Sequence, residues 1–125
     1  MSAESKFNPI AMEAARRVHR ALGDETRLLV ARRVAKGPCT VTELIADTQI
    51  AGPLVSWHLR RLNAAGLINQ TKSGRETICN FNYQVLAAAH ALMLQQLNIS
   101  DPEAWAAPSA IAIESAKSLP LRQEG

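Results

Sequence analysis

One segment of the chain carries side chains suited to contact with nucleic acid. In residues 53–62, Val55, Leu59 and Leu62 recur at i, i+4 and i+7, and at about 100° per residue they share one apolar helical stripe. The positions that point away from this stripe include a hydroxyl, an indole and two guanidiniums. They are Pro53, Ser56, Trp57, Arg60 and Arg61. A free helix face of this composition can reach base edges and phosphates in a major groove.

The residues upstream predict how this helix is positioned. A shorter helical pattern has Thr40 or Thr42 as its N-cap and ends near Asp47. Only a few residues around 50–52 separate the two patterns, which is the spacing of a helix-turn-helix. Residues 53–62 are therefore the candidate recognition helix.

A predicted β-hairpin follows this unit. Gly66 suits the C′ position of the recognition helix, and residues 67–72 and 75–81 predict two short strands around a Ser73-Gly74 turn. A helix-turn-helix followed by a hairpin is a winged helix, so the expected fold class is mainly α with a small β-hairpin wing. Basic side chains near the hairpin tip can touch phosphate or enter a minor groove. They are Lys72 and Arg75.

Four segments carry more specific motifs: A-L-G-D-E-T-R-L-L-V at 21–30, T-E-L at 42–44, P-L-V-S-W-H-L-R-R-L-N-A-A-G-L-I at 53–68 and S-G-R-E at 73–76. Together they resemble the ArsR/SmtB family of small bacterial winged-helix repressors. The D-x-T-R entry to the second helix and the V-S-x-H-L-x-x-L-x-x-A-G-L of the recognition helix are the most specific pieces. The resemblance covers Ala14 to Leu97. It implies a regulator that dimerises through its first and last helices.

Composition is consistent with one small DNA-binding domain. The chain has 125 residues, of which 47% are hydrophobic but only 4% aromatic, which favours an Ala-rich helical core. The net charge is +3, and residues 53–75 hold four bases and no acid, so positive charge is concentrated on the candidate DNA-facing unit. A merely solvated basic face is the alternative. The sequence has no grouping of nucleophile, base and orienting residue, so we expect no enzymatic activity.

The first two helices have clear start signals. Asn8 with Pro9 predicts the first helix, which ends near Gly23, and Asp24 predicts the N-cap of the second. The expected buried side of the second helix comprises Leu28, Ala31, Val34 and Ala35.

The last clear helix begins at Asn82 and is apolar on almost every side. Such a helix must be covered on two sides, and in so small a domain one side is left for a second subunit. We therefore expect a homodimer, as the resemblance also implies. The residues expected at or near the contact are Ala14, Val18, Ala88, Leu92 and Gln95.

The chain divides into three parts. Residues 1–8 form a flexible N-terminus, 9–98 the winged helix-turn-helix DNA-binding and dimerisation domain, and 99–125 a C-terminal tail that is partly helical or disordered. Trp105 in the tail either docks on the dimer or lies in a disordered segment. An apolar pocket between the last helix and the Trp105 segment is the expected place for a small-molecule effector.

A transition-metal site needs three or four converging Cys, His or carboxylate ligands. The cysteine pair that some family members carry at the start of the third helix corresponds to Thr40 and Thr42 here, so the resemblance implies no such thiolate site. The weak candidates are His90 and His19, which only a coincidence of folding or of the dimer axis could combine into a site, for example a two-fold site built from both copies. We expect no metal and no cofactor, and DNA affinity that is insensitive to zinc, nickel, cobalt and arsenite.

The two cysteines, Cys39 and Cys79, lie far apart in sequence and on different predicted elements. We expect small buried hydrophobes rather than a redox pair. Neither a signal peptide nor an apolar run of membrane-spanning length is present, so we expect a cytoplasmic protein without a membrane partner.

The recognition helix departs from the family in its local support. Gln49 stands where a turn glycine is common, and Ala51 replaces the usual Ser or Thr cap, at a cost of about 1 kcal/mol that Pro53 partly offsets. His58 lies at the flank of the apolar stripe and is expected to pack or cap rather than read bases. Trp57 can contact DNA, or it can be partly covered by a neighbouring element.

These observations predict a dimeric, sequence-specific transcriptional regulator of the ArsR type, a repressor without the usual metal sites. It would bind a short inverted repeat in double-stranded DNA and respond to an unidentified signal. Two alternatives remain: a winged-helix module that binds a partner protein with Trp57 as anchor, and a DNA-architectural protein without sequence preference.

Overall fold

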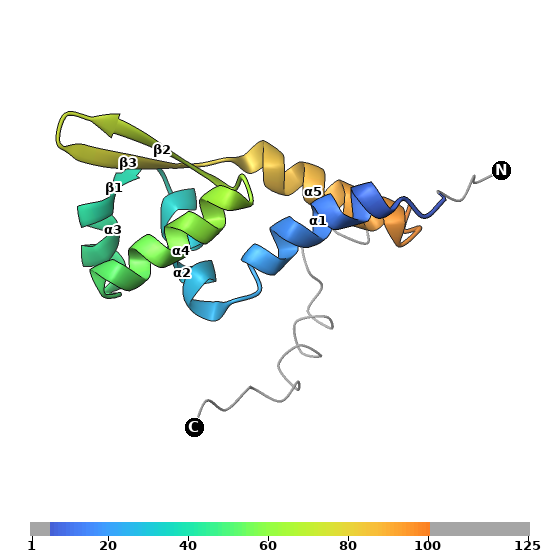
Figure 1. Ribbon diagram of the computed structural model, residues 1–125, viewed down its shortest axis with the longest axis horizontal. Helices are drawn as coiled ribbons and strands as arrows, with labels where there is room; N and C mark the ends of the chain where they lie inside the picture. The colour runs from blue at the N-terminus through green and yellow to red at the C-terminus, as the bar shows by residue number, and fades with distance from the viewer. Residues whose placement is uncertain (1–5, 101–125) are drawn as a thin grey trace, which may run out of the picture.

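The computed structural model describes residues 6–100; residues 1–5 and 101–125, which include Trp105, lie outside the described part. The elements in chain order are α1 (Pro9–Ala21), α2 (Glu25–Ala35), β1 (Cys39–Thr40), α3 (Val41–Thr48), α4 (Gly52–Ala64), β2 (Ile68–Ser73), β3 (Glu76–Phe81) and α5 (Tyr83–Gln96). α1 and α5 lie side by side at one end of the molecule, and at the other end the β2–β3 hairpin runs along one side of α2, α3 and α4 (Figure 1). None of the described helices is long and apolar enough to cross a membrane.

Side-chain caps begin the first three helices. The N–H groups of Ile10 and Ala11 donate to Asn8 Oδ1 at 3.0 and 3.2 Å, so the predicted cap is confirmed. Asp24 likewise accepts from the N–H of Arg27 at 2.9 Å. Each cap satisfies backbone donors that have no partner inside the helix.

α3 begins with a capping box. The N–H of Glu43 donates to Thr40 Oγ1 at 3.1 Å, and the N–H of Thr40 donates to Glu43 Oε1 at 3.1 Å. Thr40, and not Thr42, is therefore the cap, because only at position 40 does the hydroxyl reach the third helical residue.

The turn between α3 and α4 has the weak local support that its sequence predicts. Gln49 adopts a left-handed backbone with φ of 58°, a conformation that glycine adopts with less strain. Ala51 is the N-cap of α4 and makes no side-chain capping hydrogen bond. Pro53 lies in the first turn, where its missing N–H costs nothing.

The wing is the predicted hairpin with its turn shifted by one residue. Ser73 pairs with Glu76, so the two-residue loop is Gly74-Arg75 rather than Ser73-Gly74. Gly74 has a φ of +64°, which explains why the loop forms around this glycine. The sheet has a third strand, β1, which two residues are too few to predict, and the strand order is β1-β3-β2.

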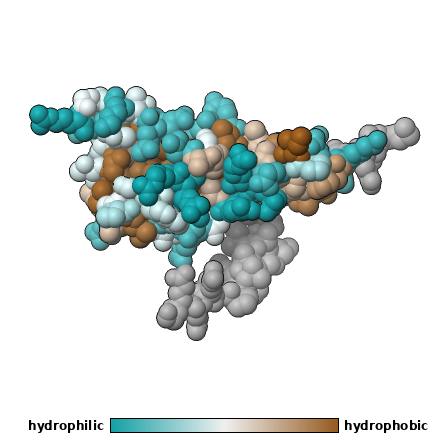
Figure 2. Space-filling model, viewed as in Figure 1, coloured by the Kyte–Doolittle hydropathy of each residue, from teal (hydrophilic) through white to brown (hydrophobic). Residues whose placement is uncertain are grey.

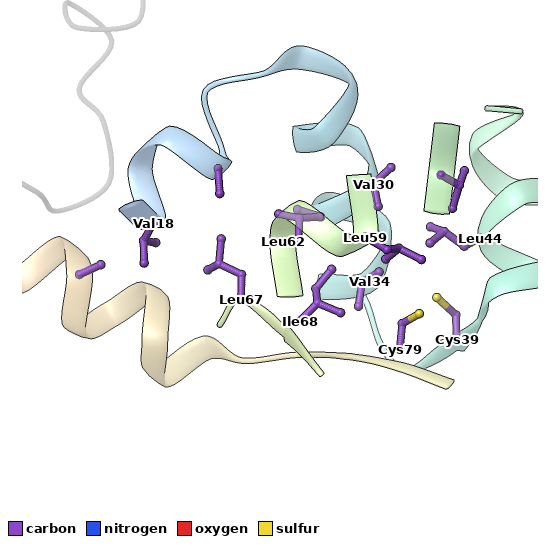
Figure 3. Packing of buried hydrophobic residues seen from close by; sticks show 14 residues of the cluster. Val18, Val30, Val34, Cys39, Leu44, Leu59, Leu62, Leu67, Ile68 and Cys79 are labelled. Atoms are coloured by element: carbon purple, nitrogen blue, oxygen red, sulfur yellow. The ribbon is translucent and has the colours of Figure 1, made fainter. Parts of the chain in front are cut away.

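The core lies between α2, α3, α4 and the sheet and extends to α1 and α5 through Val18, Ala21 and Ala89 (Figure 3). Its largest fully buried side chains are Leu44, Leu59, Leu62, Leu67, Ile68, Val30, Val34, Val55 and Cys79. Ala31 and Val34 lie on the predicted buried side of α2, but the prediction for Leu28 is wrong. Leu28 is 50% exposed, because Val30 rather than Leu28 shares the buried face with Val34.

The fold brings the two cysteines together, although they lie far apart in sequence and on different elements. Cys39 on β1 lies directly opposite Cys79 on β3 in an antiparallel pair, and the side chains face each other in Figure 3. Pairing of the short β1 with the wing places them there. Both are free thiols and both are buried, as predicted, and burial raises the pKa of each thiol. A raised pKa keeps a thiol protonated and poorly reactive.

His58 is a polar residue within this apolar core. Its side chain is only 3% exposed and its Nδ1 has no hydrogen-bond partner. Burial lowers the pKa of His58, an effect that the nearby Asp24 carboxylate opposes and Arg27 reinforces. The histidine therefore packs, as its place at the flank of the stripe predicts, and stays neutral at neutral pH.

We predict that Thr40→Ala lowers the free energy of unfolding by about 1 kcal/mol, because it removes one half of the capping box. Urea denaturation measures this difference. Thr42→Ala is the matched control: Thr42 is exposed on the first turn of α3 and caps nothing, so its loss should change stability little. Equal effects of the two substitutions would contradict the role of Thr40.

We also predict an acid-sensitive component of stability from His58. Its pKa is lower in the folded than in the unfolded state. Below about pH 6.5 the unfolded state therefore binds a proton more readily than the folded state does. Stability should therefore fall as the pH drops from 7 to 5, and less so in His58→Leu. The lowered pKa of Asp24 affects stability only near or below its ordinary value of 3.8. Urea denaturation measured as a function of pH therefore separates the effect of Asp24 from that of His58. An unchanged pH profile in His58→Leu would contradict this assignment.

Candidate nucleic-acid interface

α4 has one buried and one free face. Val55, His58, Leu59 and Leu62 are buried against the rest of the domain. The residues on the opposite side are exposed, and we call them the outer face of α4: Pro53, Ser56, Trp57, Arg60 and Arg61. The predicted apolar stripe and the predicted free face are therefore both confirmed as positions in the fold.

Trp57 is held within the outer face by two guanidiniums. The Cζ atom of Arg61, one turn along α4, lies 4.8 Å from the centroid of the indole, and that of Arg27 on α2 lies 5.8 Å away. The ring of His58 meets the indole edge-on at 4.9 Å. Cation–π attraction of this kind orients both the ring and the arginines. Because 40% of Trp57 remains exposed, a large apolar surface is still available beside two positive charges.

Sequence reasoning missed Arg27 as a member of this surface. The residue belongs to the D-x-T-R motif at the start of α2, and its position three residues after the cap Asp24 was assigned no role beyond the motif. The signal that could have found it is the packing of α2 on α4, which the one-dimensional pattern does not specify.

The wing adds two exposed bases. Lys72 lies on β2 opposite Thr77, and Arg75 lies in the two-residue turn at the tip. The hairpin carries them away from the body of the domain, beyond α3 and α4 (Figure 1). Glu76, the first acid after the basic stretch, is also exposed, so the tip carries both signs of charge while the outer face of α4 carries only positive charge.

α1 and α5 pack together and leave an apolar surface. Ala14, Ala88 and Gln95 are exposed and Leu92 is partly buried, as a contact surface requires. Val18 differs from the prediction: only 5% of it is exposed, because it packs in the core of its own chain beneath that surface. Ile10, at 83% exposure, and Leu97 are large exposed apolar residues that the sequence analysis did not select. Figure 2 shows hydrophobic surface gathering at this α1/α5 end.

The two weak metal candidates lie closer than their separation in sequence suggests. The rings of His19 on α1 and His90 on α5 have centroids 6.4 Å apart, and His19 Nδ1 is 2.6 Å from the carbonyl oxygen of Ala15. Within residues 6–100 no group of three or more His, Cys, Asp or Glu side chains is placed to hold a metal ion. Insensitivity to metals stays a prediction.

Comparisons with known proteins agree with this geometry. A family model described as bacterial regulatory protein, arsR family, matches residues 24–70, which run from the cap of α2 into the wing. The HTH-type transcriptional regulator Rv2034 of Mycobacterium tuberculosis is 36% identical over 72 residues, which are 58% of this chain and 67% of that protein.

Solved structures share the fold. The crystal structure of the ArsR family transcriptional regulator RHA00566 matches with a TM-score of 0.60 at 28% identity, over 76% of this chain and 95% of that one. A homodimeric winged helix-turn-helix DNA-binding domain, Mb0332 from Mycobacterium bovis, matches with a TM-score of 0.60 at 22% identity, over 78% and 89% of the two chains. Three findings agree: the family model, the relative, and the arrangement of α3, α4 and the wing. The chain therefore belongs to the ArsR family of bacterial regulatory proteins, which are DNA-binding transcriptional regulators.

Proposed function

We propose that the protein is a dimeric repressor that binds a short inverted repeat in double-stranded DNA through the outer face of α4. The observation that carries this proposal is the division of α4 into a face buried in the core and a face of exposed polar, aromatic and cationic side chains without any acid. A rigidly anchored helix with such a free face suits insertion into a major groove.

The side chains of this face suit different contacts. Arg60 projects away from the buried stripe and has a free guanidinium fork, which suits bidentate hydrogen bonds to guanine. Ser56 lies one turn earlier on the same side and can bond to a base or a phosphate. Arg61 is held against Trp57 at the flank, which suits a phosphate contact, and Trp57 can pack on thymine methyls or sugars. Lys72 and Arg75 on the wing would contact the backbone or the adjacent minor groove.

A dimer would present two copies of α4 to DNA. The exposed apolar surface of α1 and α5 supports an isologous contact around Ala14, Ala88, Leu92 and Gln95, with Val18 packed beneath it. Two recognition helices related by a two-fold axis read an inverted repeat whose half-sites lie about one helical turn apart. The homodimeric state of Mb0332 supports the same arrangement.

Two other functions make different predictions. In a protein-interaction module, Trp57 would be the central anchor and binding would depend weakly on salt. A DNA-architectural protein would show steep salt dependence but no preferred sequence. The exposed Arg60 opposite the buried stripe favours sequence reading over both, because its guanidinium would have base edges within reach once α4 lay in a major groove.

The proposal includes a cytoplasmic location, no catalytic activity and no resident metal. The effector would then be a small organic molecule rather than an ion. The pocket expected for it involves the segment around Trp105, which lies outside the described residues.

We predict that Arg60→Ala weakens binding to the preferred sequence by roughly 1–3 kcal/mol and relaxes the preference at one position of each half-site. Selection of bound fragments from genomic DNA, followed by titration of the selected site and its single-base variants, measures both effects. Arg32→Ala, which removes an exposed arginine from α2 outside the outer face, is the control. A uniform loss on all sequences would make Arg60 a phosphate contact instead.

We predict that the protein is a homodimer and that Ala88→Glu makes it a monomer at micromolar concentration, because the substitution places a carboxylate on the apolar surface of α5. Light scattering measures the mass. Ala46→Glu puts the same charge on an exposed position of α3 and should leave the dimer intact. A monomeric wild type, or a dimeric Ala88→Glu, would contradict this contact.

A further inference from the structure

A second basic feature adjoins the outer face of α4. Where α1, α2 and α4 meet, a cleft of about 200 Å³ is lined by four arginines, and the rest of its lining is alanine. The arginines are Arg17, Arg20, Arg27 and Arg61. We call this the arginine cleft.

Within the described part of the chain, no carboxylate forms an ion pair with an arginine of the cleft. The ion pairs within residues 6–100 join Arg16 to Glu13 and Arg33 to Asp47, and neither involves a cleft arginine. Asp24 acts electrostatically on Arg27, but its Oδ1 accepts from the backbone N–H of Arg27 rather than from the guanidinium. Four like charges around one small volume repel each other, so an anion bound among them is strongly favoured.

Arg27 lines the cleft, and one of its side-chain donors is unsatisfied. Its Nε atom is buried and has no hydrogen-bond partner within the described chain. A buried donor without an acceptor is costly, so Arg27 would gain if a bound anion brought an acceptor oxygen to it. The indole of Trp57 lies within 5.8 Å of the Arg27 Cζ and 4.8 Å of the Arg61 Cζ, so both guanidiniums are already oriented.

We propose that the arginine cleft is a binding site for a phosphate-type oxyanion. Planar guanidinium forks match the oxygen geometry of phosphate, and charge-assisted hydrogen bonds of this type are the strongest available to a surface site. The phosphate can come from two sources, the phosphodiester backbone of bound DNA or free phosphate in solution.

Position favours the DNA backbone, a preference that rests on the proposed function. Arg61 belongs both to the outer face of α4 and to the cleft, so the two surfaces are continuous. α4 lies between α3 with the wing on one side and α1 on the other (Figure 1). The wing and the arginine cleft would therefore contact phosphates on opposite sides of the groove that α4 enters.

The first experiment measures how DNA affinity depends on salt. Arg17→Gln/Arg20→Gln removes two exposed cleft charges, whereas Arg32→Gln/Lys36→Gln removes two exposed charges that line a different cleft, beside α3. Each phosphate contact contributes roughly 0.9 to the slope of log affinity against log salt. We expect the cleft variant to lower the slope by about one to two on preferred and random DNA alike, and the control variant to keep the wild-type slope.

The second experiment tests free phosphate. Trp105→Phe leaves Trp57 as the only tryptophan, so its fluorescence reports on the cleft. Inorganic phosphate is titrated against chloride at equal ionic strength. A saturable change that Arg17→Gln/Arg20→Gln abolishes and Arg32→Gln/Lys36→Gln preserves identifies free phosphate as a ligand. If the cleft variant changes the salt slope but phosphate causes no saturable fluorescence change, the DNA backbone is the source. Either result supports the proposal.

The proposal is overturned if the cleft and control variants behave alike in both experiments. That outcome is distinct from failure of the proposed function. If the wild type binds no DNA, the repressor proposal fails and the phosphate titration alone decides the nature of the cleft. If Arg60→Ala alters DNA binding while the cleft variant changes neither the salt slope nor the titration, only the cleft proposal fails.

Discussion

The burial of one side of α4 is the constraint on which the rest of the structure depends. Val55, Leu59 and Leu62 pack against α2, α3 and the strands, and this contact fixes both the depth and the rotation of the helix. The rotation of α4 determines which side chains form the candidate interface, because it turns Ser56, Trp57 and Arg60 outward. A shift of one position along the helix would turn the apolar stripe by about 100° and place charged side chains in the core. The free energy of the core therefore also orients the surface proposed to read DNA.

Local signals alone would specify this helix poorly. Ala51 cannot cap α4, and Gln49 adopts a left-handed backbone that most side chains disfavour. α3 is different, because the capping box of Thr40 and Glu43 begins it firmly. α3 is therefore stabilised locally by its cap, whereas α4, which follows a strained turn, is stabilised mainly by tertiary packing. The buried His58 likewise contributes through packing. It fills space between α4 and α2, although one of its ring nitrogens has no hydrogen-bond partner.

Periodicity and caps predicted most of this fold, because both are properties of short sequence windows. These local features include the N-caps Asn8 and Asp24, the outward face of α4 and the hairpin. The errors lie where the answer depends on which distant elements meet. Leu28 was assigned to the core on α2 because several rotations of a short helix satisfy the same pattern, and only packing on α4 selects Val30. Cys39 and Cys79 do lie on separate elements, but the pairing of those elements was missed, because the two-residue strand that aligns the cysteines has no sequence signal.

The same limit explains why the basic surface is larger than the sequence suggested. Counting charges between Pro53 and Arg75 finds only bases that are close in sequence, whereas the arginine cleft combines residues from α1, α2 and α4. Arg27 joins this surface through the α2 contact that buries the apolar side of α4, so the packing that orients the recognition helix also places a guanidinium beside Trp57. The Trp57 indole orients Arg27 and Arg61, and charges that are already oriented lose less conformational entropy on meeting a phosphate than flexible ones do. The packing of α2 on α4 therefore determines both the core contact and the electrostatics of the side proposed to face DNA.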